Sequence, residues 1–300
     1  MKIGLLVGGN SAERDVSLSS GKAIFKALES LGNSVIILDT INGIRDLEDK
    51  IMSVDLIFNG LHGGDGENGN VAAFLESLDV VFTGSDQESS KICMNKDLSK
   101  KIVFEKGILT PKWITSHDLP GQSELEDLGL PIIVKPNDQG STIGLSIVKN
   151  INELSGAYNN ALKHADSIIF ESFIHGREIT VPVIGSSAFS IVEIVPRNDL
   201  YDYECKYTPG MSEYFCPANL EIRLSEKIKN IALKIHKILK CRHYSRVDFL
   251  LDDNNKLWFL EINTLPGMTE TSLLPKSLSA DGYNFTDVIQ MIIDEATKNL

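Results

Sequence analysis

The sequence lacks the patterns that mark membrane, exported and zinc-binding proteins. No apolar run among its 300 residues approaches the ~18 needed to span a bilayer. The apolar stretch of residues 1–9 runs into glycines and is short for the core of a signal peptide, so we expect it to form a first buried strand. The cysteines show no CxxC pair and no zinc-like histidine spacing, which predicts free thiols in a reducing cytoplasm at Cys93, Cys205, Cys216 and Cys241.

Positive charge is scarce as well. The chain carries 29 Lys and Arg against 41 Asp and Glu, a formal net charge of −12. Nucleic acids and anionic membranes require clustered Lys and Arg, so neither is expected as a partner. A hydrophobic fraction of 42% and a charged fraction of 23% are typical of a globular protein, and the length allows two or three domains.

Two common nucleotide-binding fingerprints are missing. The chain contains no GxxxxGK[ST] segment, and no GxGxxG follows the first expected strand. A P-loop and a dinucleotide fold of that type are therefore unsupported, and phosphates would have to be held in another way.

The first third of the chain alternates strand and helix signals. Strands are expected at residues 2–7, 35–39, 56–59 and 80–83, and Ile24, Leu28 and Leu31 mark one face of a helix. This pattern predicts an α/β domain over residues 1–95 with a mostly parallel sheet. Ligands bind at the carboxyl ends of such strands, where residues 8–17 and 61–69 form loops.

The remainder predicts an α+β fold in two parts, residues 96–182 and 183–300. A Lys-rich helix is followed by two apolar strands around a Gly/Ser loop, which indicates a hairpin over residues 131–148. Later strands are expected at residues 168–171, 178–184, 189–195, 246–251 and 257–262. Helices are expected over residues 228–239 and after Thr286 and Asp287, which are suited to begin the last one.

Acidic side chains interrupt two of the late apolar strands. Strand alternation places Arg246 with Asp248 on one face, and Glu261 with Asn263 on another. The Asp-Asn-Asn turn at residues 253–255 joins the two strands in a hairpin, so these groups converge. Magnesium prefers such oxygen ligands together with substrate phosphates, which predicts an open magnesium site for a nucleotide. The alternative is a cross-strand salt bridge on a solvated acidic face.

Lys135 ends a strand that faces the Gly/Ser loop of residues 140–144, and Lys96 begins the same region. The backbone N–H groups of such a loop can cover phosphates. A lone lysine at a strand end is more commonly a solvated cap, but a lysine followed by a glycine-bounded Ser/Thr loop favours a phosphate site.

Several segments together resemble the ATP-grasp ligases, and within them the D-alanine–D-alanine ligase family. The segments most similar to the family are KPNDQGSTIG at 135–144, RVD at 246–248 and EINTLPGM at 261–268. The segment of residues 8–17 is similar to the family's first substrate loop, and HGGDGENG at 62–69 to its second. Residues 201–207, with 214–217 after them, resemble the family's mobile loop. The similarity extends over nearly the whole chain in one order, and it implies an N-terminal α/β domain followed by a two-part ATP-grasp domain.

The resemblance implies ATP as co-substrate and assigns residues to it. Lys96 and Lys135 would contact phosphates, Glu171 the adenine edge and Glu178 the ribose. Two Mg²⁺ ions, for which Mn²⁺ can substitute, would be held by Asp248, Glu261 and Asn263. Lys206, on a loop that closes over the site and excludes water, would reach the γ-phosphate.

The resemblance also implies a two-step reaction on D-alanine. One carboxylate attacks the γ-phosphate to give an acyl phosphate, and the amine of a second D-alanine then displaces phosphate. Arg246 and the amide of Gly267 would stabilise the oxyanion. Glu13 would bind the ammonium group, oriented by Ser141 and Tyr207, with His62 nearby. Ser272 and the amide of Leu273 would bind the second carboxylate at a helix start.

Other interpretations remain open for single residues. His62 can be a turn residue beside glycines, Glu13 a charge at a helix N-terminus, and Tyr207 a packing aromatic. The second loop departs from the family pattern with Asn68 where Asp is more common, and with Ala72 and Ala73 in place of a Gln-Gly pair. Relatives that form a D-alanyl-D-lactate ester typically lack the tyrosine at 207, so its presence favours peptide formation.

The leading hypothesis is therefore synthesis of D-alanyl-D-alanine for peptidoglycan precursors by a cytoplasmic enzyme, with D-alanine and ATP as small-molecule partners. Family members are commonly homodimers. The alternatives are another ATP-grasp ligase, such as a D-alanyl-D-lactate or different dipeptide ligase, and a catalytically inactive binding protein on the same fold.

Overall fold

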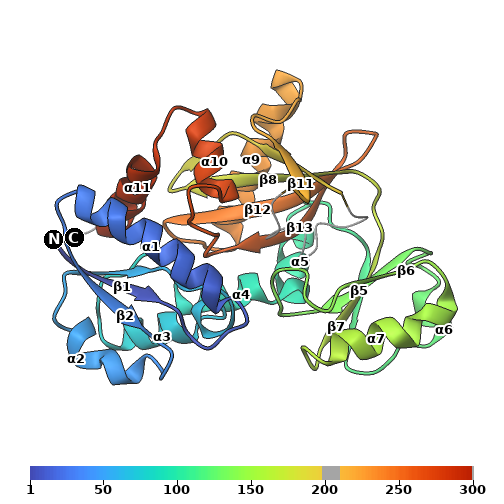
Figure 1. The fold of residues 1–300 in the computed structure, drawn as a ribbon. Helices are drawn as coiled ribbons and strands as arrows, with labels where there is room; N and C mark the ends of the chain where they lie inside the picture. Colours follow the sequence, from blue (N-terminus) through green and yellow to red (C-terminus); the bar gives the residue numbers. More distant parts are fainter. Residues whose placement is uncertain (198–209, 299–300) are drawn as a thin grey trace.

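The computed structural model describes residues 1–197 and 210–298. They form a mixed α/β structure with three sheets, which confirms the expected fold class (Figure 1). One sheet is parallel and belongs to the first third of the chain, and the other two are antiparallel.

The parallel sheet has the order β2-β1-β3. Its strands are β1 (Lys2–Val7), β2 (Ser34–Asp39) and β3 (Leu56–Asn59), close to the expected ranges. The prediction of a further strand at residues 80–83 is wrong, because this segment makes only an isolated parallel bridge between Ile57 and Phe82. The ladder stops there because the Thr83 hydroxyl, not a backbone carbonyl, accepts the N–H of Asn59 at 3.0 Å.

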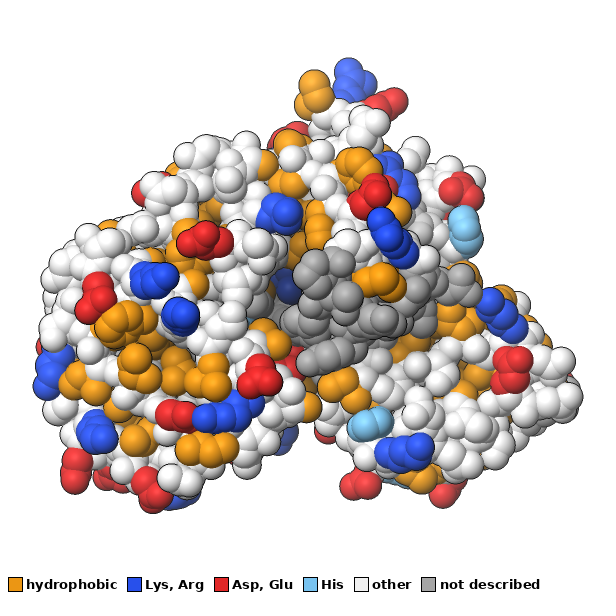
Figure 2. All heavy atoms as spheres, viewed as in Figure 1, with side chains coloured by type: hydrophobic (Ala, Val, Ile, Leu, Met, Phe, Trp, Pro, Cys, Tyr) orange, Lys and Arg blue, Asp and Glu red, His pale blue; other side chains and the backbone are white. Residues whose placement is uncertain are grey.

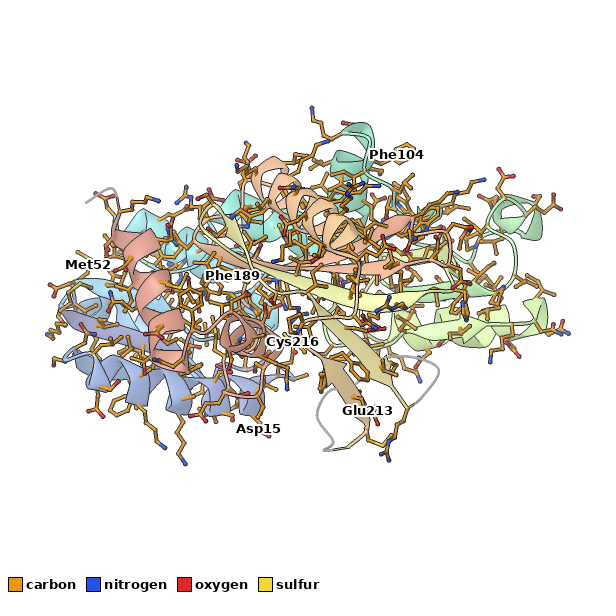
Figure 3. The ribbon with its side chains drawn as sticks, turned by 90° about the horizontal axis from the view of Figure 1, so that it is seen from above. Asp15, Met52, Phe104, Phe189, Glu213 and Cys216 are labelled. Carbon is orange, nitrogen blue, oxygen red and sulfur yellow. The ribbon has the colours of Figure 1, made fainter. Side chains whose placement is uncertain are left out.

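Helices from opposite ends of the chain pack on this sheet. In Figures 1 and 3, α1 (Arg14–Ser30) and α11 (Phe285–Thr297) lie side by side, and the two chain termini are neighbours in Figure 1. Their apolar faces share one core with β1 and β3. Helix α11 begins earlier than expected. The side chain of Asn284 accepts the Asp287 N–H at 3.0 Å and caps it, so the prediction that Thr286 and Asp287 open the helix is wrong.

The second sheet has the order β4-β7-β5-β6. It contains β4 (Trp113–Ser116), β7 (Ile168–Ser172), β5 (Ile132–Pro136) and β6 (Ser146–Val148). β5 and β6 pair antiparallel, which confirms the predicted hairpin around the Gly/Ser loop. The helix α7 (Leu154–Leu162) packs its buried face on this sheet, and α5 (Lys96–Glu105) precedes it in the chain.

The third sheet carries the acidic hairpin. Its order is β11-β10-β8-β12-β13, and β9 (Ser187–Ala188) pairs with β8. The other strands are β8 (Arg177–Ile184), β10 (Val192–Pro196), β11 (Ser212–Phe215), β12 (Tyr244–Leu251) and β13 (Leu257–Asn263). The helix α9 (Ile222–Ile238) buries its apolar stripe against them. The strand expected over residues 189–195 starts only at Val192, because Ser190 donates its N–H and its hydroxyl to Asp281.

The remaining short elements connect these layers. They are η1 (Arg45–Leu47), α2 (Glu48–Ile51), η2 (Gly64–Gly66), α3 (Asn70–Ser77), α4 (Gln87–Met94), α6 (Gln122–Leu125), η3 (Ile151–Glu153) and α10 (Leu273–Ala280). Within residues 1–197 and 210–298, no helix has the length and apolar character to cross a membrane. On the face shown in Figure 2, Lys and Arg side chains are interspersed with Asp and Glu rather than gathered in a basic patch.

Candidate active site

The β12–β13 hairpin brings the predicted acidic groups together. In its antiparallel register Arg246 faces Asn263, and Asp248 faces Glu261. The register shifts directly after Asp248, which is the position of a β-bulge. Such irregularities re-aim side chains near functional sites. Two carboxylates and one amide thus meet across two neighbouring strands, as the alternation of the sequence predicted.

Each of these carboxylates has a cationic partner from the chain. Arg246 donates from Nε and an Nη nitrogen to the two oxygens of Asp248, at 2.9 and 2.8 Å. Lys96 Nζ lies 3.1 Å from Glu261 Oε2. The Thr180 hydroxyl of β8, opposite Asp248 in register, also donates to Asp248. These ion pairs lie within β12 and between β13 and α5, so they differ from the cross-strand salt bridge that was the alternative to a metal site. The carboxylate and amide oxygens are of the kind that Mg²⁺ prefers.

A cavity of about 520 Å³ opens between the second and third sheets. Its wall includes every described residue that the resemblance assigned to the nucleotide, together with both carboxylates of the predicted metal site: Lys96, Lys135, Glu171, Glu178, Asp248 and Glu261. Apolar side chains such as Ile133, Leu145 and Leu250 line the remainder. An apolar slot with lysines at one end suits an adenine base attached to phosphates.

Glu171 lies at the back of this cavity between two lysines. Its Oε1 accepts from Lys135 Nζ at 2.6 Å and its Oε2 from Lys100 Nζ at 2.7 Å. Burial alone would raise the pKa of Glu171, but the charges of Lys100 and Lys135 outweigh it and hold this pKa at about 2. Burial lowers the pKa of Lys100 to about 8, against the opposing effect of Glu171. Both oxygens of the predicted adenine contact are thus engaged by lysines of the protein.

A second cavity of about 450 Å³ lies between the first and third sheets. Its wall holds the described residues that the resemblance assigned to the amino acids: Glu13, His62, Ser141, Gly267, Ser272 and Leu273. Asn263 of the predicted metal site and Tyr214 also line it.

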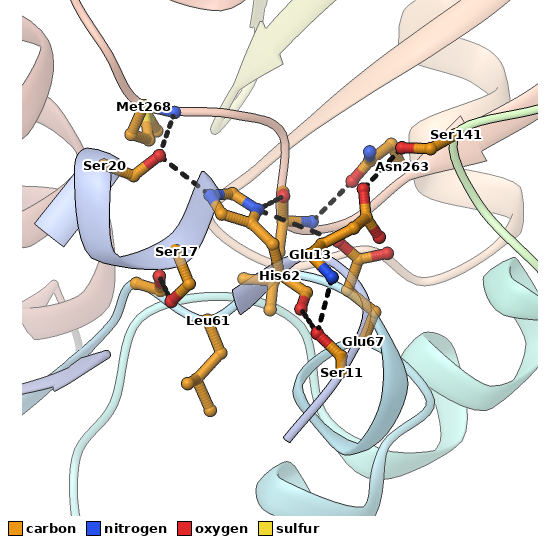
Figure 4. Close-up of polar contacts among 12 residues, drawn as sticks. Ser11, Glu13, Ser17, Ser20, Leu61, His62, Glu67, Ser141, Asn263 and Met268 are labelled. Carbon is orange, nitrogen blue, oxygen red and sulfur yellow. Dashed lines mark hydrogen bonds and ion pairs between the residues drawn. The ribbon is translucent and has the colours of Figure 1, made fainter. Parts of the chain in front are cut away.

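Glu13 and Ser141 meet although they are distant in sequence. Ser141 Oγ donates to Glu13 Oε1 at 2.5 Å, across the mouth of the Gly/Ser loop (Figure 4). Glu13 stands at the N-cap position of α1, but its side chain makes no capping hydrogen bond. The carboxylate is therefore turned into the cavity rather than toward the helix end. Ser141 has a φ of 52°, a left-handed conformation that is uncommon for a residue with a side chain.

His62 connects its own loop to helix α1 and to the loop of residues 264–268 at the second cavity (Figure 4). Its Nδ1 lies 3.0 Å from the carbonyl of Leu265, which can only accept, so Nδ1 carries the proton. Its Nε2 then accepts from Ser20 Oγ at 3.0 Å, and Ser20 Oγ accepts the Met268 N–H at 3.2 Å. His62 is 5% exposed, so this network fixes the loop of residues 264–268 rather than forming a solvated turn.

The two cavities meet at Arg246 and Glu261, which line both of them. A group bound in one cavity can therefore reach a group in the other past an arginine and a metal-type carboxylate. Arg246 can offset negative charge that develops at this junction. At Gly267 an added Cβ would lie 3.0 Å from Ser272 Oγ, so the 267 backbone stands close to the start of α10.

Every predicted site residue in the described part of the chain lies at one of these cavities. Lys206 and Tyr207, predicted on the closing loop, lie outside the described residues, as does Cys205. The sequence reasoning missed Lys100, Ser20 and Thr180. The spacing of Lys100 four residues after Lys96, on one helix face, was a signal for the first. The residues of the second loop that depart from the family pattern line neither cavity. Asn68 contacts Asp65, and Ala72 lies on the buried face of α3.

The fold and the two joined cavities together define the class of enzyme. A three-sheet chain with a phosphate-type cavity beside an amino-acid-type cavity, joined at a carboxylate and an arginine, is an ATP-grasp ligase. Residues 104–294 match the family model described as "D-ala D-ala ligase C-terminus". The chain belongs to the D-alanine–D-alanine ligase family.

Relatives agree over the full length. The chain is 41% identical to the D-alanine–D-alanine ligase of Aquifex aeolicus, over 98% of this chain and 100% of that protein. It is 39% identical to D-alanine–D-alanine ligase B of Clostridium perfringens, over 98% and 97%. The structure resembles the Bacillus anthracis D-alanine–D-alanine ligase complexed with ATP, with a TM-score of 0.88 and 33% identity over 99% and 98% of the two chains. A D-Ala:D-Ser ligase of Enterococcus faecalis also has a TM-score of 0.88, at 29% identity over 99% of each.

Proposed function

We propose that this enzyme joins two molecules of D-alanine to D-alanyl-D-alanine, with ATP converted to ADP and phosphate, in the synthesis of peptidoglycan precursors. The observation that carries the proposal is the junction of two cavities at Arg246 and Glu261. One cavity has the lysines and apolar walls suited to a nucleotide, and the other has the carboxylate and helix start suited to amino acids.

In the first cavity, Lys96 and Lys135 contact the phosphates and Glu178 the ribose. The adenine edge is assigned to the neighbourhood of Glu171, whose carboxylate also anchors Lys135 at 2.6 Å. The D-alanine carboxylate attacks the γ-phosphate from the side of the second cavity. This step needs positioning and cationic groups around the moving charge more than it needs covalent chemistry by the protein.

The donor set at the junction fits magnesium. Asp248, Glu261 and Asn263 present two carboxylates and an amide on adjacent strands, in register and beside both cavities. These residues would hold two Mg²⁺ ions, or Mn²⁺ in their place. When bound, the ions neutralise phosphate charge and orient the β- and γ-phosphates.

In the second cavity, Glu13 binds the ammonium group of the first D-alanine. Ser141 fixes the orientation of Glu13 through its 2.5 Å hydrogen bond. His62 acts from behind by holding the loop of residues 264–268. Arg246 and the Gly267 amide stabilise the oxyanion formed when the second amine attacks the acyl phosphate.

The carboxylate of the second D-alanine is assigned to Ser272 and the Leu273 amide. Ser272 is the N-cap of α10, and its side chain makes no capping hydrogen bond in that helix. The N–H groups at a helix start attract anions. By the family resemblance, Lys206 would contact the γ-phosphate and Tyr207 would orient Glu13; both lie outside the described residues.

A second candidate is ligation of D-alanine to a different second substrate. The similarity to a D-Ala:D-Ser ligase and the shared fold favour keeping D-serine and D-lactate as candidates. The higher identity to ligases named for D-alanine favours the first proposal.

We further propose that the enzyme is a cytoplasmic homodimer. We also propose that each chain has three domains, with boundaries at residues 95/96 and 182/183. ATP is a cytoplasmic co-substrate. Hydrophobic side chains gather on the N-terminal domain in Figure 2, and such patches commonly mark interfaces. Ile37, Ile41 and Met52 are exposed hydrophobic residues of this domain. The later domain boundary lies inside β8, whose pairing partners belong to the third sheet. Light scattering coupled to size exclusion reads the oligomer directly.

The test is ADP release from ATP across a panel of amino acids at fixed Mg²⁺. D-alanine alone should support turnover, and L-alanine should not. Adding D-serine or D-lactate to limiting D-alanine, with the products resolved by mass, separates the candidates. Equal turnover with L-alanine, or none with D-alanine, would overturn the proposal.

A further inference from the structure

Three buried charges stand in a row that begins at the wall of the nucleotide cavity and leads into the protein. Glu171 is central, with Lys100 Nζ at 2.7 Å from one oxygen and Lys135 Nζ at 2.6 Å from the other. Lys100 is 0% exposed and Glu171 is 3% exposed. Two cations and one carboxylate leave a surplus positive charge within this row, and burial weakens its screening by solvent.

The two lysines differ in what they can reach. Lys135 lines the nucleotide cavity, whereas Lys100 does not. An anion in the cavity can therefore contact Lys135 but not Lys100. The surplus charge is presented to the cavity by Lys135 only because Lys100 balances Glu171 from the opposite side.

Lys100 is held in this place by its surroundings. Its Nζ lies 5.0 Å from the ring centroid of Trp113, a cation–π distance. Trp113 stands opposite Glu171 in the β4–β7 register, and its Nε1 donates to Asp97 on α5 at 2.8 Å. A buried lysine is costly to desolvate, and replacing all members of a buried ion-pair set by apolar residues is often neutral or stabilising. A purely architectural role for Lys100, Glu171 and Lys135 would thus favour apolar side chains at all three positions, which points to a role for the charges themselves.

We propose that Lys100 is a positioning residue for nucleotide binding: it neutralises Glu171 from behind, so that the charge of Lys135 stays available to the phosphates. This inference rests on the proposed function in taking ATP as the occupant of the cavity. Without Lys100, Glu171 and Lys135 form a closed neutral pair, and the cavity loses its surplus positive charge. The pKa of Glu171, held at about 2 by Lys100 and Lys135 together, agrees with a carboxylate that stays ionised between them.

The direct test is titration of the purified enzyme with ATP and Mg²⁺ in the absence of amino acid. Lys100→Met should weaken ATP binding by about tenfold or more, the scale of one lost charge interaction near a protein site. Lys100→Arg keeps the charge and should restore most of the affinity. Lys101→Met is the matched control, since Lys101 is the next residue of α5, with a side chain 58% exposed. It should leave ATP affinity unchanged.

Steady-state kinetics separate this role from a general structural one. Lys100→Met should raise the KM for ATP and leave the KM for D-alanine within about twofold, because the second cavity contains no part of the charge row. Equal rises in both constants, or an unchanged ATP affinity in a folded Lys100→Met enzyme, would overturn the proposal.

A double-mutant cycle shows whether Lys100 acts through Glu171. In a Glu171→Gln background the carboxylate no longer competes for Lys135, so adding Lys100→Met should not weaken ATP binding further. If Lys100→Met alone does not fold, the Glu171→Gln and Glu171→Gln/Lys100→Met variants can still be compared, because the double variant buries no unbalanced carboxylate. A full additional loss in the double variant would contradict the proposal.

The same preparations keep the two claims apart. D-alanine-dependent ADP release by the unmodified enzyme reports on the proposed function. The ratio of ATP dissociation constants between variants reports on Lys100, whether or not D-alanine is the substrate.

Discussion

Asp248 on β12 and Glu261 on β13 stand opposite each other in the antiparallel register, at the point where the nucleotide and amino-acid cavities are closest. Glu261 lines both cavities, and Asp248 lines the first. This pair places metal-type oxygen ligands between two binding sites. The geometry accounts for a reaction in which a phosphate from one side is transferred to a carboxylate on the other.

Glu261→Gln should abolish turnover while the chain still folds. The substitution keeps the size of a side chain that forms an ion pair with Lys96, and it removes a negative ligand. We expect kcat to fall by about 10²–10³ or more, the scale seen when a single preorganised electrostatic group is removed. ADP release measures this, and circular dichroism checks the fold. Asp253→Asn, in the turn of the same hairpin with a side chain 89% exposed, is the control. Near-normal activity in Glu261→Gln would remove the metal assignment.

Ser141→Ala should weaken binding of the first D-alanine without weakening the binding of ATP. The variant removes the hydroxyl that donates to Glu13 at 2.5 Å, so the carboxylate loses its orientation. A hydrogen bond to a charged group contributes about 1.5–3 kcal/mol, which corresponds to a rise of about tenfold or more in KM. Initial rates at saturating ATP give the KM for D-alanine. Ser187→Ala, at an exposed position of β9, should change nothing. A rise in the ATP constant alone would show that Ser141 serves the other cavity.

Gly267→Ala should impair the second substrate most. An added Cβ would lie 3.0 Å from Ser272 Oγ, which is closer than ordinary contacts, so the Ser272 hydroxyl at the start of α10 must move. We expect the higher of the two D-alanine KM values to increase several-fold, on the order of the loss from a misplaced binding group. Gly156→Ala, with nothing within 4 Å of the added atom, is the matched control for the substitution itself. An unchanged profile in Gly267→Ala would separate Gly267 and Ser272 from the second carboxylate.

Glu171 should make folding stability sensitive to acid. Its pKa is lowered from 4.5 to about 2, so the folded state holds the ionised form more strongly than the unfolded chain does. The stability this contributes is present above pH 4.5 and is lost as the pH falls toward 2. Urea unfolding between these pH values should show a steeper loss for the native sequence than for the Lys100→Met/Glu171→Gln pair. Parallel slopes would show that Glu171 is not held as described.

The sequence predicted the acidic hairpin because two carboxylates break the apolar alternation of otherwise buried strands. The turn alone would pair Asp248 with Leu260. The register shift between Asp248 and Phe249 instead sets Asp248 against Glu261, and only the structure reveals it. Lys100 was missed for the opposite reason. A lysine in a Lys-rich helix is expected to be solvated, and only tertiary packing against Trp113 and Glu171 buries it.

Side chains that take the place of backbone groups in hydrogen bonds explain the wrong predictions of strand ends and helix starts. The Thr83 hydroxyl ends the β3 ladder, Asp281 holds Ser190 out of β10, and Asn284 starts α11 ahead of Thr286. Each is a local competition between a side chain and a carbonyl, which composition and periodicity do not reveal. The sequence pattern likewise could not predict that the two cavities join, because this depends on how the three sheets pack.

The most direct measurement follows the oxygen of D-alanine. With D-alanine labelled by ¹⁸O in its carboxylate, attack of that carboxylate on the γ-phosphate transfers one labelled oxygen to the phosphate that is later released. We predict one ¹⁸O per phosphate, with D-alanyl-D-alanine and ADP formed in equal amounts. Unlabelled phosphate, or ADP formed without dipeptide, would contradict a transfer between the two cavities at Arg246 and Glu261.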